Sequence, residues 1–418
     1  MARQAVWNGV DGLSGRYLLP KIAVPQLARL ARGEAAERIP AFRAVAHGVD
    51  AFDLSSAGWG VIFAADLDPR VKRSLAPLLE HRRAQATRGG GGAYREYAHH
   101  PGETGREFLR RQRTGPGVAD GRRVPYYLLI VGSPEAVPFD FQYQLDLQYA
   151  VGRLWFADAC SYASYARSVI AAESGPRAPR ARAALFAVRN ADDRATHGTS
   201  EYLVAPLAAR LAQDGRSFRT LAGREATKAN LKLLLGGGDT PHLLFTASHG
   251  LGFPAGDPRQ FAEQGALLCG DWPGPRAWHG AIPRDFYFAA GDVEPEARLA
   301  GLVTFHLACH SAGTPRWSPL GPRQESTLAP LAVHDFVAAL PQRLLGHPLG
   351  GALAVVGHVD RAWGYSFLWE GIGSQPQTFI SMLGRVLDGA PVGHAMDDFG
   401  ERHTDIACEL LDALEAGR

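Results

Sequence analysis

Short apolar segments alternate with amphipathic helical segments over most of the chain, and this alternation restricts the fold more than any other feature. The apolar segments are continuous, which is typical of strands buried on both faces. Strands that alternate with helices predict an α/β fold with a mainly parallel sheet and helices on both faces. The predicted strands are 60–65, 126–132, 183–188, 218–221, 242–247, 302–308 and 352–356, and the predicted helices are 69–84, 201–213, 227–235 and 392–414.

Two stretches rich in glycine or proline mark the predicted domain boundaries. The first is the run Gly89–Gly92 with the polar residues up to Gly121, and the second is Gly175–Arg180. Such residues interrupt helices and strands and are typical of loops and linkers. We therefore predict an N-terminal α/β accessory region at 1–120, a second α/β segment at 121–180 and a main domain at 181–418.

Charge, hydropathy and cysteine usage exclude several classes of protein. The 44 basic and 42 acidic side chains leave a net charge of +2, which predicts neither nucleic acid nor a membrane surface as a partner. No apolar stretch is long enough for a membrane helix, and Met1–Pro20 lacks the pattern of a signal peptide. The four cysteines are widely separated, so neither a disulfide framework nor a zinc ribbon is indicated. We expect a reduced, cytoplasmic protein.

The clearest chemical signal lies where two predicted strands end. His249 follows the strand 242–247, and Cys309 follows the strand 302–308. The carboxyl ends of parallel strands meet at one sheet edge, where ligands bind in such folds. If the two strands are neighbours, imidazole and thiol project into one crevice. The histidine can then take the proton of a thiol that is mostly un-ionised at neutral pH, and can later protonate a leaving amine.

Small residues beside this pair favour a functional interpretation. Gly250 has no side chain, so its N–H can approach a reacting carbonyl closely and form an oxyanion hole with the N–H of Cys309. Taken alone, a cysteine after an apolar strand is usually a small buried hydrophobe, and a histidine there is often only a hydrogen-bonded structural residue. The two together, each at a strand end and each followed by small residues, indicate a Cys–His catalytic pair.

The segments Ser248–Gly250 and Ala308–Ser311 resemble the catalytic His-Gly and strand-end Cys blocks of the caspase-like cysteine peptidases of clan CD. That superfamily includes caspases, metacaspases, gingipains, separases and the bacterial CHAT proteases. The order of the strands agrees, and 126–153 is similar to the segment before the catalytic half of gingipain-like and CHAT-like members. The resemblance covers residues 125–415 and is best in 183–365, although the His–Cys interval is longer than in typical caspases.

The resemblance implies a three-layer caspase-like sandwich and a cysteine endopeptidase acting on protein substrates. It implies Cys309 as nucleophile, His249 as general base and acid, and Gly250 with Cys309 as oxyanion donors. Because many members work as a dyad, we assign no third acid. His310 directly follows Cys309 and cannot easily face the same side, so it is not assigned a catalytic role. The family also implies a role in bacterial defence or regulated cell death, with activation by a partner protein or an upstream protease.

The residue preferred before the scissile bond should depend on the segment after the strand 352–356. On an extended chain neighbouring side chains point to opposite sides, so Asp360 and Arg361 would not both enter the pocket. Asp360 pointing inward predicts Arg or Lys, because a carboxylate pairs with these side chains. Arg361 pointing inward predicts Asp, as in caspases. The similarity of Val359–Arg361 to an aspartate-containing element of separase and CHAT members favours the basic preference.

Three further residues are weaker candidates for substrate binding. Asp192 and Asp193 follow the strand 183–188 and fit the same pocket wall, although acids in such turns are more often merely solvated. Trp363 either stacks on the substrate or fills core. The long Gly- and Pro-rich segments 251–300 and 314–330 have the length of lids or binding loops.

Arginines in those segments suggest self-processing, with cleavage after Arg316 or Arg323 as the hypothesis. Other classes fit less well. A serine hydrolase would need a Gly-x-Ser-x-Gly elbow, which the chain lacks. We expect no cofactor and no metal, because His306, Cys309 and His310 do not all face one way on a strand. A caspase-like scaffold with an idle dyad is the non-enzyme alternative.

Overall fold

The computed structural model divides by its internal contacts into two units. The first comprises residues 1–35, 175–380 and 410–418, and the second comprises residues 36–174 and 381–409. The residues that the structure describes are 4–5, 9–16, 22–23, 46, 48–89, 91–115, 117–175, 182–214, 216, 218–318, 330–369 and 371–400.

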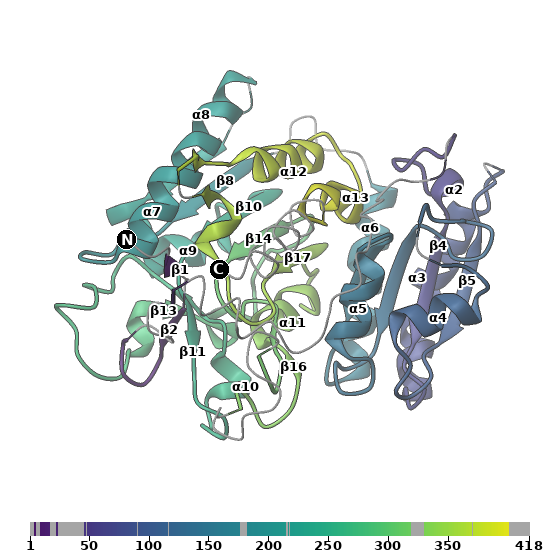
Figure 1. The fold of residues 1–418 in the computed structure, drawn as a ribbon, viewed down its shortest axis with the longest axis horizontal. Helices are drawn as coiled ribbons and strands as arrows, with labels where there is room; N and C mark the ends of the chain where they lie inside the picture. The colour runs from purple at the N-terminus through teal and green to yellow at the C-terminus, as the bar shows by residue number, and fades with distance from the viewer. Residues whose placement is uncertain are drawn as a thin grey trace. The chain divides into compact units, whose positions relative to one another are not determined.

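A five-stranded sheet, parallel throughout, forms the centre of the first unit in the order β17-β14-β10-β8-β9 (Figure 1). Every residue of β8 and β10 is buried, which explains why their sequences are continuously apolar. The strands are β8 (Ala183–Ala187), β9 (Phe218–Ala222), β10 (Leu243–Ala247), β14 (Val303–Leu307) and β17 (Ala354–Gly357).

Alternate side chains of these strands enter two hydrophobic layers. Phe186 and Leu244 pack in one core with Leu231 of α9 and Leu344 of α11. Phe245 belongs to the other layer, where its ring meets the edge of Phe379 at the start of α12. The helices and helical turns are α7 (Arg194–Thr199), η1 (Ser200–Val204), α8 (Ala205–Gln213), η2 (Gly223–Glu225), α9 (Lys228–Leu234), α10 (Gln260–Glu263), η3 (Arg284–Phe286), η4 (Ala290–Asp292), α11 (Ala339–Leu345), η5 (Gly364–Ser366) and α12 (Gln377–Leu387).

The long segment between β10 and β14 folds into a small layer of its own instead of the open loop that we expected. Its strands join the N-terminal β2 in a second sheet of order β13-β12-β11-β2. A compact core that includes Leu251, Phe253, Leu268 and Trp272 lies within this layer. The strands are β2 (Gly9–Asp11), β11 (Gly250–Gly252), β12 (Leu267–Leu268) and β13 (Tyr287–Phe288).

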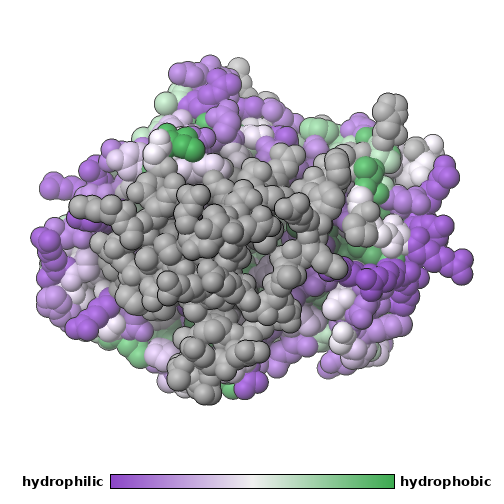
Figure 2. Space-filling model, viewed as in Figure 1, coloured by the Kyte–Doolittle hydropathy of each residue, from purple (hydrophilic) through white to green (hydrophobic). Residues whose placement is uncertain are grey.

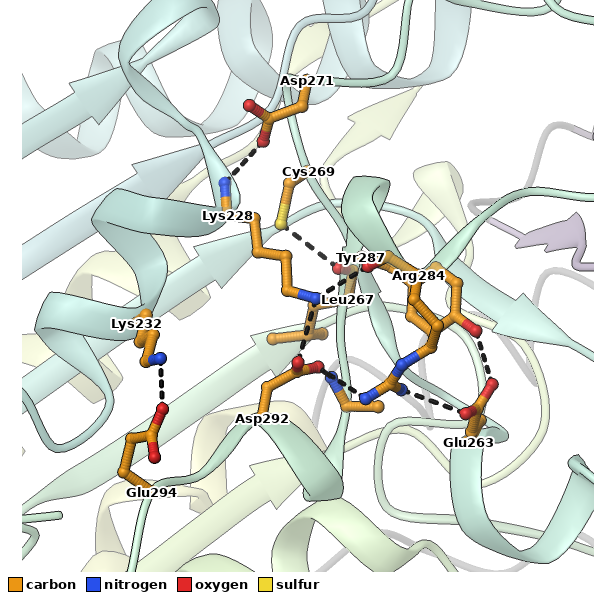
Figure 3. Close-up of polar contacts among 11 residues, drawn as sticks. Lys228, Lys232, Glu263, Leu267, Cys269, Asp271, Arg284, Tyr287, Asp292 and Glu294 are labelled. Atoms are coloured by element: carbon orange, nitrogen blue, oxygen red, sulfur yellow. Dashed lines mark hydrogen bonds and ion pairs between the residues drawn. The ribbon is translucent and has the colours of Figure 1, made fainter. Parts of the chain in front are cut away.

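A network of charged side chains ties this layer to α9 (Figure 3). The Lys228 ammonium lies 2.9 Å from Asp292 and donates to the Arg284 carbonyl at 2.7 Å. The Arg284 guanidinium lies 3.1 Å from both Asp292 and Glu263, and the Tyr287 hydroxyl also donates to Glu263. These contacts are only partly exposed, so they fix the layer more firmly than isolated surface pairs would.

Short two-stranded pairs complete the first unit. They are β1 (Gln4–Ala5) with β3 (Ile22–Ala23), β15 (Gly313–Thr314) with β16 (Phe336–Val337), and β18 (Leu368–Trp369) with β19 (Gly373–Ser374).

The second unit is a separate three-layer α/β structure on a parallel sheet of order β5-β4-β6-β7 (Figure 1). Helix α3 packs with α6, and α4 packs with α5. Ile62 and Ile130 of the sheet share a core with Phe108 of α4 and Phe141 of α5. The elements are α2 (Leu54–Ala57), β4 (Trp59–Phe63), α3 (Pro69–Ala86), β5 (Tyr94–Ala98), α4 (Gly105–Arg111), β6 (Tyr127–Val131), α5 (Phe139–Asp146), β7 (Ala150–Leu154), α6 (Ala159–Ser174) and α13 (Val392–Ala395).

The predicted α/β class with a mainly parallel central sheet is confirmed, and each predicted strand overlaps an observed one. The predicted helix 201–213 is also present, although its first turn is the wider η1. Of the predicted helix 392–414, residues 401–414 lie outside the described residues, as does most of the predicted linker Gly175–Arg180.

The predicted domain boundaries differ from the two units and from the strand pairing in three places, because strands far apart in the sequence pair across them. The boundary at 120 cuts through one sheet, since β4 pairs with β6. Residues 9–11, assigned to the accessory region, pair with β11 of the first unit. Residues 381–400, assigned to the main domain, belong to the second unit, where the Tyr126 hydroxyl donates to Asp397.

None of the described helices is long and apolar enough to cross a membrane. Figure 2 shows one face of the molecule, on which the described side chains are mainly hydrophilic and the hydrophobic ones form small separate areas.

Two fully buried histidines lie at the carboxyl half and end of β14. His306 makes hydrogen bonds with the hydroxyls of Thr246 (2.8 Å) and Thr304 (3.3 Å), and His310 makes one with the hydroxyl of Thr314 (3.2 Å). Burial lowers the pKa of His306 to about 3 and that of His310 to about 4. Both imidazoles are therefore neutral in the folded protein at neutral pH.

We predict that acid destabilises the first unit below pH 6.5. Below this pH the two histidines bind protons in the unfolded chain but not in the folded chain. The free energy of unfolding therefore falls by up to about 1.4 kcal/mol per pH unit for each histidine, until the pH reaches the pKa of that histidine in the folded chain. Urea unfolding between pH 7.5 and 4.5 measures this slope. His306→Gln should make the slope shallower, whereas His279→Gln, at an exposed histidine, should leave it unchanged. An unchanged slope in His306→Gln contradicts the prediction.

Candidate active site

The register of two parallel strands places the predicted pair at one sheet edge. Ala247, the last residue of β10, lies opposite Leu307, the last residue of β14. His249 and Cys309 each follow two residues later, and the amide of Ser248 donates to the Leu307 carbonyl at 3.2 Å. The interval of sixty residues between His249 and Cys309 is thus the register offset of the two strands.

Gly250 packs directly against the backbone of Cys309. A Cβ atom at position 250 would lie 1.8 Å from the Cys309 carbonyl oxygen and 2.8 Å from its amide nitrogen, distances that no side chain tolerates. The His249–Gly250 and Cys309 segments therefore touch through their main chains, and glycine is required at this point.

A buried carboxylate holds the imidazole of His249. Its Nε2 lies 2.7 Å from Oδ2 of Asp193, and both side chains are fully buried. The same carboxylate caps α7, accepting from the Ala195 amide at 3.1 Å and the Thr196 hydroxyl at 2.8 Å. Because α7 fixes the carboxylate, the orientation of the imidazole is fixed as well.

Asp193 is the site residue whose role the sequence analysis missed, since it was weighed only as a pocket wall. One signal could have found it. Asp193 follows β8, and β8 pairs with β10, so their carboxyl ends meet at the same edge as His249. An aspartate that caps the next helix there also has a fixed carboxylate. The order of the strands in the sheet, however, cannot be predicted from the sequence alone.

The sulfur of Cys309 is fully buried and contacts the segment that follows β17. Its Sγ accepts a hydrogen bond from the Ala362 amide at 3.3 Å. Burial raises the pKa of the Cys309 thiol to about 12, and the Ala362 amide and the nearby Arg361 charge only partly oppose this effect. The thiol is therefore protonated at neutral pH in this arrangement. A direct pairing of the Cys309 thiol with the His249 imidazole stays a prediction.

Main-chain hydrogen bonds join the turn after Cys309 to this same segment. The amide of His310 donates to the Asp360 carbonyl at 2.6 Å, and the amide of Ala312 donates to the His358 carbonyl at 3.0 Å. The amide of Asp360 returns a bond to the Gly313 carbonyl at 3.3 Å. The His310 side chain bonds Thr314, as described above. The two segments therefore form one connected structure around the sulfur.

Asp360 and Arg361 contact one common group, although the prediction from an extended chain placed their side chains on opposite sides. Both side chains contact the Ser318 hydroxyl, which donates to Asp360 at 2.7 Å and accepts from Arg361 at 2.9 Å. The guanidinium also lies 3.6 Å from the carboxylate. That prediction assumed an extended chain, whereas Asp360 has a φ of +69°, which breaks the alternation of side chains. Which of the two side chains faces a substrate stays a prediction.

Two other predicted binding residues make contacts of a different kind. The Asp192 side chain is half exposed and pairs with Arg276 at 3.3 Å. Trp363 precedes η5, and its carbonyl accepts from the Ser366 amide and hydroxyl. Their roles in substrate binding stay predictions. Among the described residues, no group of three or more His, Cys, Asp or Glu side chains is arranged to hold a metal ion.

No family model matches the chain, and no curated protein matches it. Three solved structures are similar to it. The Arg-specific cysteine proteinase gingipain R is 12% identical with a TM-score of 0.48, covering 84% of this chain and 76% of its own. A complex of the pro- and mature domains of RgpB from Porphyromonas gingivalis is 11% identical with a TM-score of 0.46, covering 82% and 73%. A structure described only as a protease is 10% identical with a TM-score of 0.42, covering 74% and 60%. Likenesses at this level assign no function to the chain.

We predict that Asp193→Asn slows the reaction of Cys309 with an alkylating peptide by about 10²-fold or more. Asparagine has one acceptor oxygen, which can keep the capping bond from the Ala195 amide but not the bond from the Thr196 hydroxyl as well, and its amide nitrogen does not stabilise a positive charge on His249. The loss should therefore be large in reactivity and smaller in stability. The labelling rate constant and the urea midpoint measure the two effects. The matched control is Asp53→Asn, because Asp53 caps α2 in the same way without contacting a histidine. Equal labelling rates in Asp193→Asn and the unmodified protein would contradict the prediction.

Proposed function

We propose that the chain is a caspase-like cysteine endopeptidase with Cys309 as nucleophile and His249 as general base and acid. One observation supports this most strongly. Two parallel strands end in register with a histidine and a cysteine, and the glycine after the histidine packs against the cysteine backbone. The buried carboxylate that holds His249 also supports the proposal, because it can stabilise the imidazolium that forms when the histidine takes a proton from the thiol.

The proposed reaction begins when His249 takes the proton of the Cys309 thiol and the sulfur attacks the peptide carbonyl carbon. Asp193 stabilises the imidazolium that forms and keeps its ring in one orientation. The amides of Gly250 and Cys309 donate to the oxyanion of the tetrahedral intermediate. His249 then returns the proton to the leaving amine, and water hydrolyses the resulting thioester.

The burial of the sulfur indicates that this form of the chain is a resting form. Burial raises the pKa of the Cys309 thiol to about 12, so the thiol is protonated at neutral pH. The sulfur is covered by a main-chain amide and lies beside a charged pair, so a shift of that segment would expose it. We propose that a protein partner or an upstream protease causes this shift, and that the protein acts in the cytoplasm in bacterial defence or cell death.

The proposed preference is for Arg or Lys before the scissile bond, because Asp360 offers a buried carboxylate two residues before the amide that bonds the sulfur. A caspase-type preference for Asp through Arg361 is the alternative within the same class. A second candidate function is a catalytically idle scaffold. The complete burial of Cys309 favours it.

We predict that fluorogenic peptides with Arg or Lys before the scissile bond are hydrolysed, and that Cys309→Ala abolishes the activity. An alkylating peptide should label Cys309, as mass spectrometry of the digested protein would show. Cys160→Ala is the matched control, because Cys160 is an exposed thiol at the start of α6 in the second unit. Hydrolysis only after Asp would overturn the basic preference, and no labelling of Cys309 with or without candidate activators would favour the scaffold.

We also predict self-cleavage after Arg316 or Arg323. Arg316 lies in a turn in which its amide donates to Asp335 and its carbonyl accepts from the Leu331 amide, so cleavage there requires local opening. Arg323 lies outside the described residues. The purified protein should fragment at one of these sites over time, as intact-mass measurement would show. Fragmentation of Cys309→Ala at the same rate would remove the hypothesis, because another protease would then be responsible.

A further inference from the structure

Three consecutive residues after β17 cover the sulfur and form an ion pair at the same time. Asp360 and Arg361 are joined through the Ser318 hydroxyl, and the next amide, that of Ala362, donates to the sulfur of Cys309. The Asp360 and Arg361 side chains are only 6% and 8% exposed. Charge pairing and covering of the sulfur are therefore properties of one short segment.

The ion pair is incompletely satisfied. The closest approach between guanidinium and carboxylate is 3.6 Å, which is longer than a hydrogen bond. Oδ1 of Asp360 and Nε of Arg361 are buried and have no hydrogen-bond partner in the described structure. A buried charged group that lacks partners is unfavourable, so this carboxylate has unused capacity to bind a donor.

We infer that Arg361 is a resident counter-ion, which a guanidinium-bearing side chain of the substrate replaces on Asp360. This inference rests on the proposed peptidase function. A free guanidinium can approach a carboxylate with two parallel N–H···O bonds, which the tethered Arg361 does not make. The exchange would satisfy Oδ1 of Asp360 and release Arg361 toward solvent.

The exchange also connects recognition with reactivity. Arg361 and Ala362 are adjacent in the chain, so movement of Arg361 away from Asp360 draws the Ala362 amide from the sulfur. A basic substrate would therefore uncover the nucleophile as it binds. An acidic side chain before the scissile bond cannot replace Arg361, so Asp360 would stay paired with Arg361 and the segment would stay in place.

The test uses binding, so that its result does not depend on peptidase activity. Arg361→Ala leaves Asp360 buried without a counter-ion, and millimolar methylguanidinium should restore the pair. We expect methylguanidinium to raise the Tm of Arg361→Ala by about 2–4 °C at saturating concentration. Methylammonium should have a smaller effect because it cannot bind in a bidentate way. The double variant Arg361→Ala/Asp360→Asn should show no rise.

The matched control is Arg259→Ala, which removes a similar arginine from the more exposed Asp257 and should not respond to methylguanidinium. If Arg361→Ala does not fold, Arg361→Gln keeps a group that can contact Ser318 and is measured in the same way. An equal rise in Tm for Arg361→Ala and for the double variant would overturn the inference. So would the absence of any rise in both Arg361→Ala and Arg361→Gln.

Kinetics separate this inference from the proposed function. If the protein is a peptidase, Arg361→Ala should lower the KM for peptides with Arg before the scissile bond about tenfold with little change in kcat, because no resident cation competes. Loss of hydrolysis after Asp in this variant would instead make Arg361 the recognition residue and overturn the inference. A methylguanidinium response in a protein without any peptidase activity would support the ion exchange and remove only the proposed function.

Discussion

The parallel pairing of β10 with β14, in the register that sets Ala247 opposite Leu307, is the constraint on which the candidate site depends. The neighbouring strands extend the same edge, so an acid after β8, an imidazole after β10, a thiol after β14 and an ion pair after β17 follow one another along it. Segments far apart in the sequence thus supply one group each. A slip by one residue would turn each side chain to the other face, so the buried cores on both faces of the sheet also protect the site.

The strand ends at this edge share an unusual backbone conformation. Asp192, His310 and Asp360 have φ values of +56°, +58° and +69°, and in the described residues only Arg113 is a further non-glycine case. Aspartate and histidine tolerate this region better than most residues, but it still costs free energy that surrounding bonds must offset. The amide of His310 bonded to the Asp360 carbonyl at 2.6 Å is one such bond. The turns therefore depend on each other, and the sulfur lies between two of them.

Sequence reasoning could place His249 and Cys309 at strand ends because each follows an apolar run that is buried on both faces, and such runs are typical of central strands in a parallel sheet. Their catalytic role stays a prediction. It could not find Asp193 as the partner of His249, because strand order decides that contact. The pairing of residues 9–11 with β11 was missed for the same reason: it links segments about 240 residues apart. The failed alternation at Asp360 has a local cause, since one left-handed residue changes which side every following side chain takes.

In the proposed mechanism, latency and specificity arise from the same contacts. Burying a thiol and an ion pair together is unfavourable unless their partners compensate, and here the partners are supplied by Ser318 and the amide of Ala362. Any event that moves Ser318 weakens the hold on Asp360 and Arg361, and through Ala362 it also weakens the cover on the sulfur. If the proposal holds, activation from outside and recognition of a basic side chain act on one element, so a change that makes activation easier should also relax the discrimination between substrates.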